Sequence, residues 1–80
     1  MPNLSPQRHA PALIALGGAI RRLRQERKMS QEQLALAATA DRSHLGRIER
    51  GENEIAVLLL VRLAKALGVS VADVMAEAGL

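Results

Sequence analysis

Apolar residues recur at helical spacing in five segments of this 80-residue chain, and no segment shows the period of two that marks a strand. The segments are residues 12–28, 31–38, 42–50, 57–67 and 71–77. Residues 1–11 contain three prolines and no periodicity, which predicts a flexible N-terminal arm. Residues 12–80 are therefore expected to form one compact, all-α domain of five helices.

Two of these segments, residues 31–38 and 42–50, are predicted to form a helix-turn-helix unit around which the other helices pack. Ser30 and Gln33 have the spacing of a capping box, and Asp41 can cap the following helix. Gly51 stands where a helix end favours a left-handed backbone. Two short helices at a steep angle leave their apolar faces uncovered, so the remaining segments are expected to supply a scaffold.

The polar face of segment 42–50 is the main candidate for binding chemistry. Helical geometry gathers its hydrogen-bonding side chains near the N-terminal half of one face; they are Arg42, Ser43, His44 and Arg47. A helix that presents such groups at this end suits the major groove of double-stranded DNA.

Segment 57–67 is apolar almost all round, which is more than one helix of a small domain can bury. Its inner face is predicted to be Leu60, Leu63, Ala64 and Leu67. Leu58 and Leu59 are left over and are predicted to form a dimer or partner interface, because exposed apolar patches usually mark one. The alternative is that they are scattered surface leucines.

A charged pair is predicted at the edge of the core. Arg24 lies one turn after the apolar Ile20, and Glu49 lies beside the apolar Ile48. Because an unpaired charge at a core edge is costly, the two side chains are expected to form a structural salt bridge. The alternative is that both are independent surface charges.

Composition narrows the choice of partner and chemistry. The net charge is +3, most of the Lys and Arg residues fall between residues 21 and 50, and there is no Phe, Tyr or Trp. Single-stranded nucleic acids are usually held by aromatic stacking, so this pattern favours a double-stranded partner. There is no Cys, and the two histidines lack a metal-binding spacing, so neither metal nor cofactor is expected.

No arrangement of serines, histidines or carboxylates suggests catalysis, so the chain is expected to be neither an enzyme nor a binder of a small-molecule substrate. No segment has the length of a membrane span or the charge order of a signal peptide. A cytoplasmic location is therefore expected, without membrane contact.

Four motifs in order resemble the phage-repressor type of helix-turn-helix proteins, the Xre or Cro/repressor family, and the length is similar to that of small restriction–modification controller proteins. The motifs are IRRLR at residues 20–24, SQ-x-x-LA at 30–35, RIERGEN at 47–53 and LAKALGVS at 63–70. The resemblance implies a lambda-repressor-like fold and a dimer formed through the C-terminal helices.

The same resemblance implies roles for single residues. Gln31, Arg50 and Asn53 match positions that contact DNA phosphates, whereas Arg42, Ser43 and Arg47 match base-reading positions, with His44 beside them. Arg24 and Glu49 match the internal salt bridge of the family. One departure is the loop at residues 54–56, which reads Glu-Ile-Ala where relatives often have Asn-Pro-Ser, so the following helix lacks a side-chain cap.

The sequence therefore predicts a sequence-specific transcriptional regulator that binds a pseudo-palindromic, double-stranded operator as a homodimer. The alternative is an antitoxin-like module that neutralises a partner protein through the Leu58 and Leu59 face and binds DNA secondarily. A co-encoded toxin or a stable hetero-complex would favour the alternative.

Overall fold

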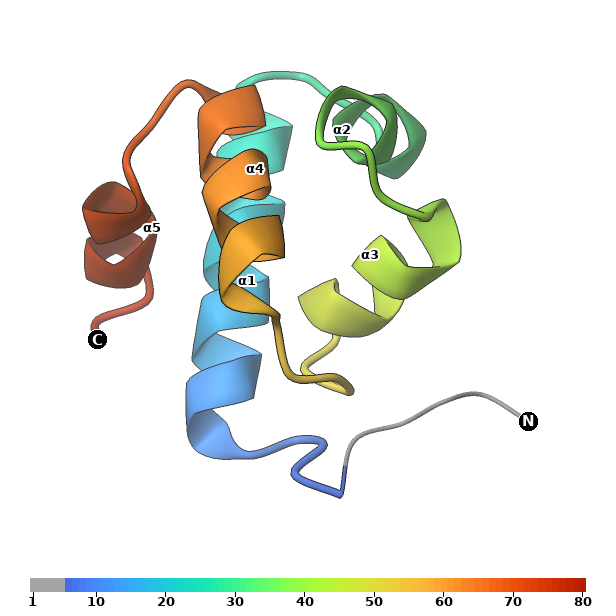
Figure 1. Cartoon of the computed structure of the whole chain (residues 1–80). Coiled ribbons are helices and arrows are strands. Elements are labelled where there is room, and N and C mark those ends of the chain that lie inside the picture. Colours follow the sequence, from blue (N-terminus) through green and yellow to red (C-terminus); the bar gives the residue numbers. More distant parts are fainter. Residues whose placement is uncertain (1–5) are drawn as a thin grey trace.

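The computed structural model describes residues 6–80, and these residues form five helices and no strand. The helices are α1 (Pro11–Glu26), α2 (Gln31–Ala37), α3 (Arg42–Glu49), α4 (Val57–Leu67) and α5 (Val71–Glu77). Helices α1 and α4 run side by side at the centre, with α2 and α3 on one side and α5 on the other (Figure 1). The predicted all-α, five-helix fold is confirmed, with small differences at the ends of α1, α2 and α3.

Local capping explains where most of the helices begin. The Ser30 hydroxyl accepts a hydrogen bond from the Gln33 backbone N–H at 3.0 Å, and the Gln33 side chain accepts one from the Ser30 N–H at 2.7 Å. Ser70 and Asp73 form the same capping box at the start of α5. Helix α4 begins without a side-chain cap, as its loop sequence predicts. Each capped start satisfies backbone N–H groups that have no partner within the helix.

The core lies between α1, α4 and the α2–α3 unit, and α5 closes it from the other side. Its fully buried large side chains come from all five helices: Ile20, Leu34, Leu45, Ile48, Leu63, Leu67 and Val74. Leu59 also belongs to this core, with 6% of its surface exposed. Its assignment to an interface is wrong, because Leu59, Leu63 and Leu67 recur every four residues and share the inner face of α4.

The outer face of α4 keeps part of the predicted apolar surface. Leu58 is 73% exposed, and it is flanked on the same helix by the exposed Val57 and Val61. None of the helices within residues 6–80 has the length and apolar character needed to span a membrane.

Helix α1 approaches the end of α3 so closely that a side chain would not fit between them. A Cβ atom at Gly17 would lie 2.1 Å from the Ile48 carbonyl oxygen and 3.0 Å from the Glu49 carbonyl oxygen. Both oxygens belong to the backbone and have little freedom to move away. Gly17, which weakens the helix by its propensity, is therefore what allows α3 to seat against α1.

Candidate nucleic-acid interface

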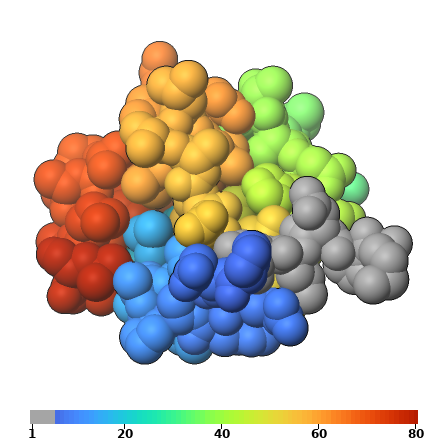
Figure 2. All heavy atoms as spheres, turned by 60° about the horizontal axis from the view of Figure 1, so that its bottom comes forward, coloured from blue at the N-terminus to red at the C-terminus, as the bar shows by residue number. Residues whose placement is uncertain are grey.

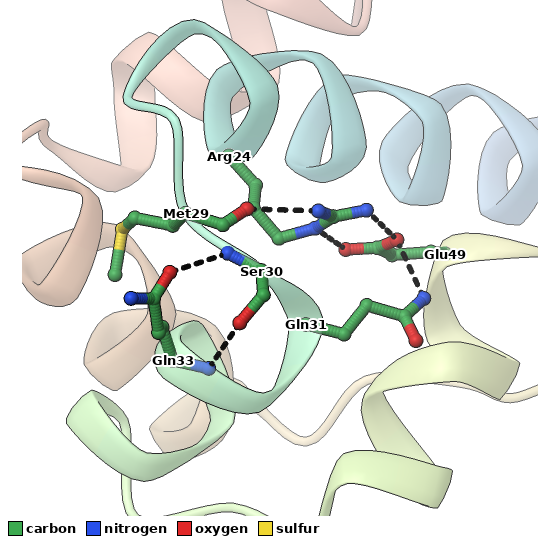
Figure 3. Close-up of polar contacts among 6 residues, drawn as sticks. All are labelled: Arg24, Met29, Ser30, Gln31, Gln33 and Glu49. Carbon is green, nitrogen blue, oxygen red and sulfur yellow. Dashed lines mark hydrogen bonds and ion pairs between the residues drawn. The ribbon is translucent and has the colours of Figure 1, made fainter.

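A buried ion pair fixes α3 relative to α1. The Arg24 guanidinium donates two hydrogen bonds to the Glu49 carboxylate, Nε to Oε2 at 2.7 Å and Nη2 to Oε1 at 2.9 Å (Figure 3). The side chains of Arg24 and Glu49 are only 11% and 2% exposed. The hydrogen bond to Glu49 raises the pKa of Arg24 further, against the opposing effect of burial. The structure thus places these two residues in the pair that the sequence predicts.

The same network reaches α2 and the turn before it. The Arg24 Nη1 donates to the Met29 carbonyl oxygen at 2.9 Å, and the Gln31 Nε2 donates to the Glu49 Oε1 at 3.0 Å (Figure 3). Glu49 therefore joins α1, α2 and α3 at one point. Because one carboxylate holds all three helices, the α2–α3 angle is set by buried contacts rather than by the turn alone.

The outer surface of α3 borders an open hollow, called here the α3 hollow. It is lined by His9, Gln31, Arg42, Ser43, Gly46, Arg47, Arg50 and Glu52. Five residues that the sequence predicts to contact DNA therefore line one surface, although they come from two helices and the following loop. Four of the lining side chains can carry positive charge, and one, Glu52, is acidic.

Two predicted contact residues lie elsewhere. Asn53 is only 8% exposed and does not line the α3 hollow, so its predicted phosphate contact is not supported by its position. The turn after Gly51 brings Asn53 against the body of the domain, which spacing along the chain does not show. His44 is half-buried and also lies outside the hollow lining.

Arg47 is the least exposed of the three arginines that line the α3 hollow. Its Nε atom is buried and has no hydrogen-bond partner among the described residues. A buried donor without a partner costs about 1–3 kcal/mol, and native proteins keep few of them. The Nε atom of Arg47 is therefore a donor that the fold leaves unused among the described residues.

Arg50 is already paired at the edge of the hollow. Its Nε and Nη2 donate to the two carboxylate oxygens of Glu52 at 2.8 and 3.1 Å. The hydrogen bond from Arg50 lowers the pKa of Glu52, and the positive charges of Arg50, His9 and Arg47 act in the same direction. Glu52 was not among the site residues predicted from the sequence; its position directly after the helix-ending Gly51 is the signal that points to it.

The N-terminal segment adds His9, which the sequence analysis also missed as a site residue. The His9 backbone N–H donates to the Gly51 carbonyl oxygen. The first described residues lie against the yellow segment that follows α3 (Figure 2). Residues 1–5 of the predicted arm lie outside the described residues, whereas Pro11 already belongs to α1. No sequence periodicity marks His9, because its placement depends on this long-range contact.

A second, smaller hollow adjoins the first between α1, the start of α2 and the end of α3. Arg21, Arg24, Gln31, Glu49 and Arg50 line it. Arg21 is exposed, so it extends the basic surface from α3 onto α1. Residues 6–80 contain no group of His, Cys, Asp or Glu side chains arranged to hold a metal ion.

Comparison with known proteins gives consistent matches. The helix-turn-helix family model matches residues 20–74. The control protein C.SmaI of Serratia marcescens is 38% identical over 61 residues, which are 76% of this chain and 73% of that protein. The immunity repressor protein of Bacillus phage phi105 is 38% identical over 64 residues, 80% of this chain but only 44% of the repressor.

Solved structures agree with these sequence matches. The clp gene regulator ClgR from Corynebacterium glutamicum superposes with a TM-score of 0.82 and 38% identity, covering 85% of this chain and 87% of that one. The restriction–modification controller protein C.AhdI from Aeromonas hydrophila gives a TM-score of 0.76 and 34% identity, covering 78% and 94%. The predicted resemblance to phage repressors and controller proteins is confirmed, and this chain belongs to the helix-turn-helix family.

Proposed function

We propose that this helix-turn-helix protein is a DNA-binding transcriptional regulator that reads a specific double-stranded sequence with α3. The observation that carries the proposal is the α3 hollow, where Arg42, Ser43 and Arg47 lie on one surface beside Gln31 and Arg50. An arginine fork can donate to both O6 and N7 of guanine, and such a contact discriminates against other bases by about 1–3 kcal/mol. We assign base reading to Arg42, Ser43 and Arg47.

Phosphate contacts beside α3 would set its register on the duplex. Gln31 lies at the first position of α2, at the border between the two hollows. Arg50 lines both hollows together with Gln31, and the exposed Arg21 continues the basic surface on α1. We assign phosphate contacts to Gln31, Arg50 and Arg21. We also propose that the protein acts in the cytoplasm and has no catalytic activity.

We further propose that two copies associate through the outer face of α4. The exposed Val57, Leu58 and Val61 form an apolar face there, and an 80-residue domain gains stability by covering such a surface. A two-fold dimer would place two α3 helices about 34 Å apart on a pseudo-palindromic operator. The same face supports the second candidate, an antitoxin-like module that binds another protein.

Selection of bound duplexes from a random pool, at two salt concentrations, tests the main proposal. Recovery of a pseudo-palindrome with half-sites about one helical turn apart is the expected result. The absence of a consensus, together with binding that disappears as salt rises, would reduce the interaction to phosphate attraction and overturn sequence reading.

The role of Arg47 is tested with the selected duplex. Arg47→Ala should abolish the preference for this duplex over a scrambled one while leaving weak, salt-sensitive binding. Lys65→Ala is a matched control, because Lys65 carries the same charge, is exposed and lies outside both hollows. Unchanged preference in Arg47→Ala would show that α3 is not the reader.

The oligomer and the alternative function are separated by Leu58→Glu. Loss of a dimer in sedimentation equilibrium, with weaker operator binding, supports the second-copy arrangement. A wild-type chain that is monomeric at every concentration, and that co-purifies with a co-encoded protein only when Leu58 is intact, supports the antitoxin-like module.

A further inference from the structure

Glu52 is an acidic residue placed inside a surface that is otherwise suited to a polyanion. Of the side chains that line the α3 hollow, it is the one that carries a negative charge. Its carboxylate accepts both hydrogen bonds from Arg50, at 2.8 and 3.1 Å, with His9 and Arg47 close enough to influence its charge. The Glu52 carboxylate thus already binds the Arg50 guanidinium, which we assign to a DNA phosphate.

The backbone fixes this arrangement. Gly51 has a φ of +74°, a left-handed conformation that reverses the chain at the end of α3. The next residue then returns to the helix, where the Glu52 N–H donates to the Arg47 carbonyl oxygen at 2.9 Å. A Cβ atom at Gly51 would also lie 2.9 Å from the Ile14 Cγ1, so the turn is packed against α1. The backbone of the turn therefore fixes the position of Glu52, which does not depend on a long, mobile loop.

Exposure distinguishes this pair from the buried one. The side chain of Arg50 is 58% exposed and that of Glu52 is 21% exposed. Exposed ion pairs contribute little net stability, because water and salt compete for both partners. Two oxygens of a phosphate can accept two parallel hydrogen bonds from a guanidinium, as the two oxygens of a carboxylate do. The partner of Arg50 can therefore change without disturbing the fold.

We propose that Arg50 exchanges the Glu52 carboxylate for a phosphate when DNA binds, so that the phosphate must displace Glu52 from Arg50. This inference rests on the proposed function. After the exchange, the Glu52 carboxylate stays beside the DNA backbone without its partner. Glu52 thereby lowers affinity for any duplex, so that stable binding depends more heavily on the base contacts of Arg42 and Arg47.

A double-mutant cycle tests the exchange. The full chain and the variants Glu52→Gln, Arg50→Ala and Arg50→Ala/Glu52→Gln are titrated with the selected duplex and with a scrambled duplex over a range of salt. With Arg50 present, Glu52→Gln should tighten binding to both duplexes and steepen the slope of log affinity against log salt by up to about 0.9. With Arg50 replaced by Ala, the same substitution should have a clearly smaller effect, because there is no pair to break and only the repulsion between Glu52 and the DNA backbone is relieved.

Glu54→Gln is the matched control, because Glu54 is exposed, lies in the same loop and is absent from the α3 hollow. Its smaller effect should be the same with and without Arg50. Circular dichroism melts establish that each variant is folded.

Three results would overturn the exchange. A Glu52→Gln effect of the same size in the Arg50→Ala background would reduce Glu52 to general charge repulsion. Weaker binding of Glu52→Gln would mean that Glu52 orients Arg50 for DNA instead of competing for it. A wild-type chain that binds neither duplex at any salt would overturn the proposed function itself, and the exchange with it.

Discussion

Two arginine–glutamate pairs in this molecule have nearly the same geometry and opposite surroundings. The Arg24–Glu49 hydrogen bonds measure 2.7 and 2.9 Å, and the Arg50–Glu52 bonds measure 2.8 and 3.1 Å. The first pair is almost fully buried, whereas the second is open to solvent mainly on the Arg50 side, with 58% of the Arg50 side chain and 21% of the Glu52 side chain exposed. Geometry alone therefore does not separate a structural pair from an exchangeable one; access to water does.

The difference follows from desolvation. Once two charges are buried together, removing one leaves the other without water and without a partner, which costs about 3–5 kcal/mol. At the surface, water replaces the lost partner, and the loss is about 0–1 kcal/mol. The buried pair also holds Gln31 of α2, so its removal disturbs the placement of the whole helix-turn-helix unit.

The largest effect is expected from breaking the buried pair. Glu49→Ala leaves Arg24 unpaired at the junction of three helices and should lower the free energy of unfolding by about 3–5 kcal/mol. Urea denaturation followed by circular dichroism measures this loss. A loss under about 1 kcal/mol would mean that Glu49 behaves like the surface Glu52, and that burial does not distinguish the pairs.

The next-largest loss of stability is expected at the close contact between α1 and the end of α3, beside the buried pair. Gly17→Ala places a methyl group against the backbone of Ile48 and should cost about 1–3 kcal/mol, because a tightly packed contact must open. Gly18→Ala is the matched control: its nearest neighbour is the flexible end of Arg22 at 3.4 Å. It should stabilise α1 by about 0.5–1 kcal/mol. Thermal melts that shift in the same direction for both variants would contradict the α1–α3 contact.

Arg47 is a third type of arginine, with a buried Nε and no carboxylate partner. Arg47→Met keeps an apolar stem of similar length, removes the unsatisfied donor and should raise the free energy of unfolding by about 1 kcal/mol. The same variant should lose the preference for the selected duplex. If Arg47→Met is less stable than the parent, packing of the guanidinium stabilises the fold more than its unmatched Nε destabilises it.

The smallest effect is expected for the surface pair. The lowered pKa of Glu52 means that its contribution to stability is present above about pH 4.5 and is lost as the pH falls through the lower, folded-state pKa. Glu52→Gln has no such contribution, so the melting temperatures of parent and variant should differ slightly at pH 7 and converge near pH 3. A difference in melting temperature that grows as the pH falls would contradict a stabilising contribution from the ionised Glu52 carboxylate.

Much of the fold could be predicted because it depends on residues close in sequence. The capping boxes at the starts of α2 and α5 each join residues three positions apart, Ser30 with Gln33 and Ser70 with Asp73. Gly68 ends α4 with a left-handed φ of +74°. The bounds of α4 and α5 follow from such signals and from apolar periodicity. The α2–α3 unit was predictable for the same reason.

Other assignments required the packed molecule. Leu59 and Leu58 are neighbours with the same side chain, yet one is buried and the other is exposed, because α4 turns only part of its surface toward α1, α2 and α5. Asn53 matches a phosphate-contacting position of the family but lies against the domain. Gly17 looks like a weakness in α1 until the carbonyl of Ile48 is placed beside it.

The sequence by itself determined the five helices, their caps and the polar face of α3, because hydrogen bonding and apolar periodicity act over a few residues. Only the tertiary structure decided how deeply the predicted Arg24–Glu49 pair is buried, that Arg50 remains exposed beside Glu52, and that Glu52 and His9 border the α3 hollow. The physical reason is that burial depends on which helices cover a side chain, and those helices lie far away along the chain.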